Sequence, residues 1–215
     1  MKKIDRFLAE KLLQISAIKL QPDNPFVWAS GWNSPIYTDN RRILSYPDVR
    51  NIVKVELART IIENFPEVQA IAGVATGAIA MGAIVADTMG LPYVYVRDTP
   101  KDHGLENLIE GNLKPGQKVV VIEDLISTGG SSLKTIVALR NAGAEVIGVT
   151  ALFNYEFPMA AKRLRDNDIT MVALCNYTTM LEAARDIDYI SPSDLETLRE
   201  WRKDPANWTA PQRPF

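Results

Sequence analysis

Two adjacent acids followed by hydroxyl residues and glycines form the most chemically distinctive stretch of the chain, residues 118–132 (KVVVIEDLISTGGSS). The acids, Glu123 and Asp124, follow an apolar, β-branched run at residues 119–122 that predicts a buried strand. Apolar residues at helical spacing over residues 133–140 predict a helix after the glycines. The stretch therefore predicts a strand, a glycine-rich turn and a helix, with its polar side chains gathered at the turn.

This turn has the chemistry of a cradle for a sugar phosphate. Glycine lets a backbone approach a ligand closely, and the first amides of a helix point outward at the positive end of its dipole, where a phosphate monoester fits. Two neighbouring carboxylates would accept hydrogen bonds from the adjacent hydroxyls of the sugar. The pattern is neither the GxxxxGK[ST] loop nor the GxGxxG fingerprint. The alternative, an acid or serine that merely caps the helix, leaves most of these polar residues unexplained.

A second polar stretch places three cations within seven residues. Arg97 ends a predicted strand at residues 92–97, and Lys101 and His103 follow it. His103 is the only histidine of the chain. A lone histidine is usually structural, and a charged loop is usually a solvated surface. Displacement of pyrophosphate from a ribose, however, builds negative charge on the leaving group and an oxocarbenium-like sugar. Cations on a closing loop would stabilise that charge and exclude water, so we expect these residues to be functional.

Composition limits the class of protein. A chain of 215 residues that is 47% hydrophobic can bury one substantial core and has room for a small subdomain. A net charge of −2 gives no basic field for nucleic acid, and a single cysteine, Cys175, excludes an internal disulfide framework. The amphipathic N-terminus is unlike a signal peptide, and the uncharged stretch at residues 70–86 is short for a bilayer and interrupted by glycines. We therefore expect a cytoplasmic protein that binds neither membrane nor nucleic acid.

The elements that must position these groups alternate between strands and helices. We expect strands at residues 70–74, 92–97, 118–122, 144–153 and 169–174, and helices at 1–20, 47–65, 78–89, 133–140, 158–167 and 177–184, with a further helix capped by Ser191 or Ser193. This alternation predicts an α/β fold with a central, mainly parallel sheet flanked by helices, which binds ligands beyond the carboxyl ends of its strands. Short β-prone pieces at residues 26–29 and 36–38 flank a Ser-Gly turn and predict a hairpin or small hood within residues 21–45.

Four motifs, in their order and spacing, resemble those of type I phosphoribosyltransferases and, among these, the orotate phosphoribosyltransferases. They are FVWASGWNSPIYTDNR, GVATGAIAMG, YVR with KDHG, and VVVIEDLISTGGSS. The resemblance implies the type I phosphoribosyltransferase fold in a single domain, residues 1–215, with an N-terminal helix and hood (1–45), a core (46–175) and a helical tail (176–215). It also implies transfer of 5-phosphoribosyl from phosphoribosyl diphosphate (PRPP) to orotate, which gives orotidine 5′-phosphate and pyrophosphate in de novo pyrimidine biosynthesis.

The same resemblance implies a role for each matching residue. Lys101 and His103 would be the catalytic residues, acting chiefly electrostatically, on a mobile loop shared across the subunits of a homodimer. Glu123 and Asp124 would hold the ribose hydroxyls, and Ser127 would also touch orotate. The PRPP-binding residues would be Arg97, Lys101, His103, Glu123, Asp124, Leu125, Ile126, Ser127, Thr128, Gly129, Gly130 and Ser131. Mg²⁺ would be held mainly by substrate oxygens and water, with no dedicated protein ligands.

The chain departs from the family pattern where many members carry a cation near the orotate carboxylate or the diphosphate. These positions are Ala29, Gly77, Asp98 and Asn154. The groups that bind the orotate carboxylate therefore stay open, with backbone amides in residues 28–37 and Arg41 as candidates.

Two other functions stay open beside the one that the resemblance implies. A phosphoribosyltransferase for a purine would usually stack its base on an aromatic residue near the mobile loop, and residues 98–109 contain none. A non-catalytic PRPP sensor that regulates transcription would need a DNA-binding segment, and neither terminus supplies a basic helix of that kind.

Overall fold

A six-stranded sheet with the strand order β10-β9-β8-β5-β6-β7 forms the centre of the molecule. The computed structural model describes residues 4–28, 30–99 and 108–211. The strands are β5 (Ala70–Val74), β6 (Tyr93–Val96), β7 (Ile109–Glu110), β8 (Lys118–Ile126), β9 (Glu145–Asn154) and β10 (Met171–Asn176). All neighbouring strands are parallel except β7, which pairs antiparallel with β6. The predicted α/β fold with a mainly parallel sheet is confirmed, although β7 lies where we expected only a polar loop.

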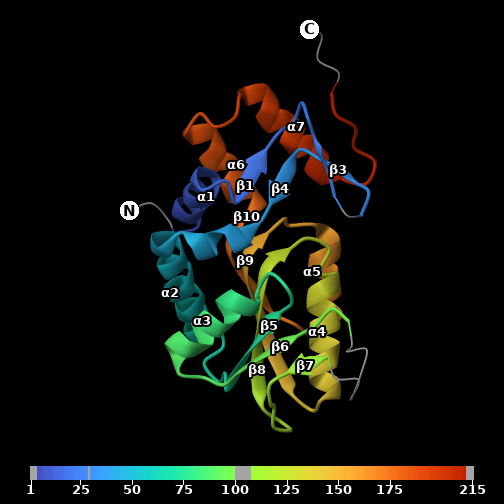
Figure 1. Ribbon diagram of the computed structural model, residues 1–215. Coiled ribbons are helices and arrows are strands. Elements are labelled where there is room, and N and C mark those ends of the chain that lie inside the picture. The colour runs from blue at the N-terminus through green and yellow to red at the C-terminus, as the bar shows by residue number, and fades with distance from the viewer. Residues whose placement is uncertain (1–3, 29, 100–107, 212–215) are drawn as a thin grey trace.

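Helices cover both faces of this sheet (Figure 1). They are α2 (Pro47–Asn64) and α3 (Ile79–Met89) on one face, and α4 (Gly130–Asn141) and α5 (Pro158–Arg165) on the other. Strands covered on both faces read as continuous apolar runs, and every residue of β5 is buried. This explains why residues 70–86 resemble a membrane span in composition. Within the described ranges, no helix is long and apolar enough to cross a membrane.

The N-terminal and C-terminal segments of the chain lie together above the sheet (Figure 1). The elements there are α1 (Ile4–Gln14), β1 (Ile18–Leu20), β2 (Phe26–Val27), β3 (Asn33–Ser34), β4 (Ile36–Thr38), the 3-10 helix η1 (Asn40–Ser45), α6 (Tyr177–Asp186) and α7 (Pro192–Lys203). The hood predicted within residues 21–45 thus contains β2, β3, β4 and η1. The helix α7 begins with a capping box between Ser191 and Asp194, as the serines of this segment predicted.

Several expected boundaries are wrong, among them the start of α4 and both ends of β10, and three differences change how the segments pair or connect. The first helix does not reach residue 20, because Ser16 takes a left-handed conformation (φ 55°) and the following residues form β1, which pairs with β4. The hairpin around the Ser-Gly turn pairs β2 with β3, and not with residues 36–38. The strand predicted at 118–122 continues to Ile126, because β9 pairs with it as far as Asn154. As a result, the two acids lie within β8 and the turn after it is only three residues long.

Candidate functional site

Residues 127–129 form the turn between β8 and α4, at the carboxyl edge of the sheet. The residue at the N-cap of α4 is Gly129, which has φ +75° and makes no side-chain capping bond. The first amides of a helix have no hydrogen-bond partners within the helix. In α4 no side chain of the N-cap residue accepts a hydrogen bond from them. The alternative in which an acid or serine caps this helix is therefore wrong. The turn has the backbone geometry to hold an anion.

Glu123 joins β8 to the first turn of α4. Its side chain is almost fully buried, and its Oε2 atom accepts hydrogen bonds from the hydroxyls of Ser131 (3.0 Å) and Ser132 (2.9 Å). Burial, and then the charge of Asp124, raise the pKa of the Glu123 carboxyl well above its usual range. The Ser131 hydroxyl, which we predicted to bind PRPP, is thus engaged with Glu123. This contact sets the position of α4 relative to the acids.

Asp124 lies against the turn that follows β5. A Cβ atom built on Gly77 would overlap the Asp124 carboxylate, so this backbone admits only glycine there while Asp124 keeps its position. The side-chain amide of Asn40, in η1, donates to the backbone carbonyl of Asp124 (2.6 Å). Burial raises the pKa of the Asp124 carboxyl as well. The hood, the β5 turn and β8 therefore all meet at this carboxylate.

The two acids border a small cavity. Glu123 and Asp124 line it together with Asn40, Arg41 and Gly77, and its volume is about 10 Å³, close to the space that one water molecule needs. The Asn40 Oδ1 atom is buried and has no hydrogen-bond partner. A buried acceptor of this kind is costly, and it would be satisfied by a hydroxyl or a cation-bound water at this position.

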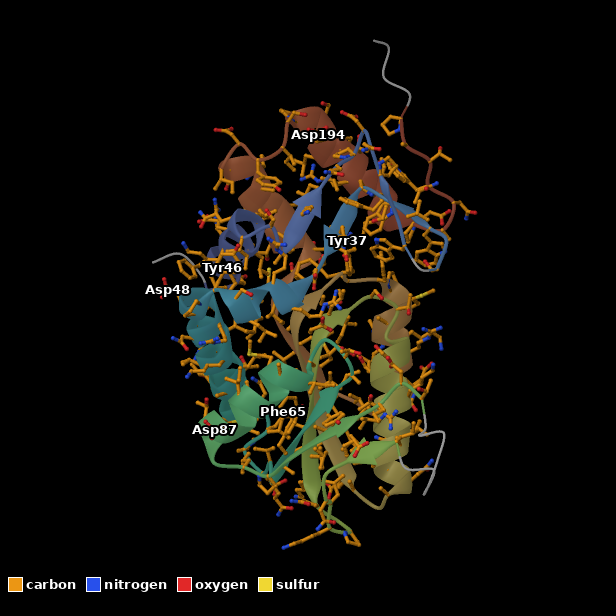
Figure 2. The ribbon with its side chains drawn as sticks, viewed as in Figure 1. Tyr37, Tyr46, Asp48, Phe65, Asp87 and Asp194 are labelled. Carbon is orange, nitrogen blue, oxygen red and sulfur yellow. The ribbon has the colours of Figure 1, made fainter. Side chains whose placement is uncertain are left out.

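A larger, open pocket of about 380 Å³ lies between the hood and the turn after β8. It is lined by Val27, Trp28, Ser30, Trp32, Tyr37, Thr38, Leu125, Ser127, Thr128 and Tyr155. Figure 2 shows Tyr37 at the junction between the hood and the sheet below it. The hydroxyls of Thr38 and Tyr155 are hydrogen-bonded to each other (2.8 Å), which ties the hood to the segment after β9. Aromatic walls with a few hydroxyls suit a small planar ring with polar edges.

The predicted PRPP residues do not all meet in one place. Leu125, Ser127 and Thr128 line the aromatic pocket, whereas the side chain of Ile126 is buried in the core. Arg97 lies near an acid of β7, with its Nη1 atom 3.6 Å from Glu110 Oε1.

The residues singled out as departures have distinct surroundings. Asp98 borders a separate groove along α4, together with Arg97, which was predicted to bind PRPP. The Asn154 side chain accepts a hydrogen bond from the backbone amide of Glu156 (2.9 Å). Lys101, His103 and Ala29 lie outside the described residues, so their predicted roles stay predictions.

Two candidate residues were missed from the sequence. Asn40 follows Asp39 in the hood motif, and nothing in that motif indicates that its amide reaches β8. Tyr155 lies two residues after the strand predicted at 144–153, at the edge of the sheet where ligands bind, which was a usable signal. Arg41, a candidate for the orotate carboxylate, donates from Nε to Asp39 Oδ1 (2.7 Å) and is otherwise half exposed.

The described residues include no cluster of three or more histidine, cysteine or acidic side chains arranged to hold a metal ion. A cation at this site would therefore take most of its ligands from elsewhere, apart from the hard oxygen donors of Glu123 and Asp124.

Comparison with known proteins shows that most of the chain is similar to phosphoribosyltransferases. The model of the phosphoribosyl transferase domain matches residues 47–186. The chain is 60% identical over 210 residues to an orotate phosphoribosyltransferase of Bacteroides thetaiotaomicron, which covers 98% of this chain and 99% of that protein. It is 50% identical over 208 residues to the enzyme of that name from Enterococcus faecalis (97% and 99%). The solved orotate phosphoribosyltransferase from Aeropyrum pernix superimposes with a TM-score of 0.75 at 29% identity, over 86% of this chain and 99% of that one.

Proposed function

We infer from its membership of the orotate phosphoribosyltransferase family, and from the site at the carboxyl edge of its sheet, that this chain transfers the 5-phosphoribosyl group of PRPP to orotate. It is a pentosyltransferase with the type I phosphoribosyltransferase fold, and its products are orotidine 5′-phosphate and pyrophosphate. The observation that carries the assignment is the shared edge: the uncapped start of α4, two acids and an aromatic pocket adjoin one another.

Each part of this edge has a task in the proposed reaction. The amides of residues 127–131 bind the 5′-phosphate, and the carboxylates of Glu123 and Asp124 accept hydrogen bonds from the ribose hydroxyls. The pocket walled by Trp28 and Tyr155 holds the orotate ring. A ring nitrogen of orotate then gives up its proton to pyrophosphate or water and forms a bond to C1 of the ribose. The bond from C1 to the diphosphate oxygen breaks, with inversion at C1, and pyrophosphate leaves.

The residues that act on the leaving group are assigned from the sequence motif. Lys101 and His103 neutralise the charge that builds on the pyrophosphate, and one of them is a candidate general acid. In a homodimer, the loop that carries them would serve the site of the partner subunit. We further propose that residues 1–215 work as one domain and that the protein acts in the cytoplasm.

The donor set fits Mg²⁺ as the cofactor. The carboxylates of Glu123 and Asp124 and the unpartnered Oδ1 atom of Asn40 are hard oxygen atoms beside one cavity, and they can accept hydrogen bonds from the water shell of the ion. When bound, Mg²⁺ would neutralise part of the charge on the diphosphate. The protein groups would orient the ribose by accepting its hydroxyl protons.

The test is the loss of orotate absorbance when the protein is mixed with PRPP, orotate and Mg²⁺. The proposal expects orotate to be consumed with one pyrophosphate released per orotate. Adenine, guanine and hypoxanthine serve as competing substrates, and turnover of one of these bases with none of orotate would indicate a purine enzyme. Tight PRPP binding without turnover of any base would indicate a sensor.

A further inference from the structure

We propose that Trp201, on the C-terminal helix α7, is a positioning residue for the aromatic pocket. The inference rests on the proposed function, because it assigns that pocket to orotate. Trp201 is fully buried, and no residue of α7 lines the pocket within the described ranges. The tail thus supports the residues that line the pocket without lining the pocket itself.

The indole of Trp201 packs edge-on against two rings that line the pocket. Its centroid lies 5.5 Å from that of Trp28, at an interplanar angle of 76°, and 6.0 Å from that of Tyr155, at 68°. Such edge-to-face pairs contribute to stability beyond the area that they bury. The orientation of both walls therefore depends on a side chain that no bound base would touch.

A hydrogen bond extends this support to the hood. The Trp201 Nε1 atom donates to the backbone carbonyl of Asn33 (3.0 Å), which lies in β3. The strand β3 pairs with β2, the strand that ends directly before Trp28. Trp28 in turn donates from Nε1 to the carbonyl of Ile36 in β4 (3.1 Å). Trp201 thus fixes both a ring of the pocket wall and the backbone of the hairpin that carries it.

The helix α7 is itself anchored. The hydroxyl of Tyr177, in α6, donates to the carbonyl of Leu198 (2.9 Å), and Arg202 Nη1 lies 3.4 Å from Glu156 Oε2. Glu156 follows Tyr155 in the chain, so this ion pair joins the tail to the same segment that forms the pocket wall. Leu198 and Arg202, which lie on either side of Trp201 in the chain, are therefore both held by residues outside α7. These two contacts restrict movement of the indole.

The experiment replaces Trp201 and compares the two substrates. Trp201→Leu removes the ring and the donor, and we expect the KM for orotate to rise about tenfold, since about 1.4 kcal/mol corresponds to a factor of ten. Trp201→Phe keeps a ring but loses the bond to the Asn33 carbonyl, and we expect a rise of about threefold. Among the described residues, neither the hydrogen bond nor the ring contacts of Trp201 involve the turn after β8, so the KM for PRPP should change less than twofold in both variants.

Trp208→Phe is the matched control, because Trp208 lies in the same tail and packs on the core without a ring contact to Trp28 or Tyr155. It should leave both KM values unchanged. Equal rises for the two substrates, or a rise for orotate in Trp208→Phe as large as in Trp201→Phe, would overturn the proposal. If Trp201→Leu does not fold, Trp201→Phe decides alone. A wild-type protein that does not use orotate would instead refute the proposed function.

Discussion

Gly77→Ala is a one-carbon change that tests whether the position of the Asp124 carboxylate matters for PRPP. A Cβ atom at residue 77 would overlap that carboxylate, and the atoms that it meets are the end of a short side chain, so the carboxylate must turn away while the backbone stays in place. We therefore expect a folded protein that uses PRPP poorly.

The expected loss of stability in Gly77→Ala is small, whereas the expected loss of activity with PRPP is large, and this difference makes the variant informative. A side chain forced about 30° from its rotamer costs about 0.5–1.5 kcal/mol, which lowers the Tm of a chain of this size by roughly 1–6 °C. A hydrogen bond to a charged group contributes about 1.5–3 kcal/mol. If Asp124 loses its bond to a ribose hydroxyl, kcat/KM for PRPP should fall by about 10- to 150-fold.

A double-mutant cycle assigns the effect to Asp124. Steady-state kinetics with varied PRPP are measured for Gly77→Ala, for Asp124→Ala and for the pair. Because Asp124→Ala removes the carboxylate that the new methyl group would displace, the double variant should be no less active than Asp124→Ala alone. Additive losses, or a Gly77→Ala enzyme with unchanged kcat/KM for PRPP, would refute the argument that Gly77 acts through Asp124.

Three further predictions concern the phosphate turn, the buried acid and Lys101. Gly130→Ala should leave the Tm unchanged or slightly raised, since the nearest atoms to a new Cβ are 3.8 Å away. The same variant should raise the KM for PRPP about tenfold, because the methyl group meets the bound phosphate. An unchanged KM would place the phosphate elsewhere. Burial raises the pKa of Glu123 in the folded state, so its contribution to stability is complete below its ordinary value near 4.5 and is lost as the pH rises through the raised pKa. Glu123→Gln should therefore melt higher than the wild type at pH 8, with an advantage that disappears towards pH 4.5, and thermal melts that show no such trend would contradict an ionised, buried Glu123. Lys101→Ala should lower kcat far more than it weakens PRPP binding, and equal losses in steady-state kinetics and direct PRPP titration would make Lys101 an ordinary binding residue.

The central sheet could be predicted because its strands are apolar along their whole length. Periodicity cannot tell where such a strand stops when polar residues follow, and this is why β8 was predicted to end at Ile122. Its last residues, including Glu123 and Asp124, are held in the strand by pairing with β9, a partner distant in sequence. The error lengthened the predicted turn but did not change which edge of the sheet carries it.

The hood was harder to predict because its strands are only two or three residues long. The Ser-Gly turn indicated a hairpin, but the pairing of β4 with β1 depends on the break at Ser16. The contact of Asn40 with β8 and that of Tyr155 with Thr38 join segments more than eighty residues apart, so no local pattern could show them. The sequence alone indicated which kinds of residue form the site. Which residues contact one another there could be seen only in the folded structure.

The most direct measurement is a crystal structure of the protein with orotidine 5′-phosphate bound. The account predicts that the phosphate accepts hydrogen bonds from the backbone amides of residues 127–131, that the ribose hydroxyls donate to Glu123 and Asp124, and that the base lies against Trp28 and Tyr155. A phosphate bound away from this turn, or two acid side chains that stay turned from the sugar, would contradict it.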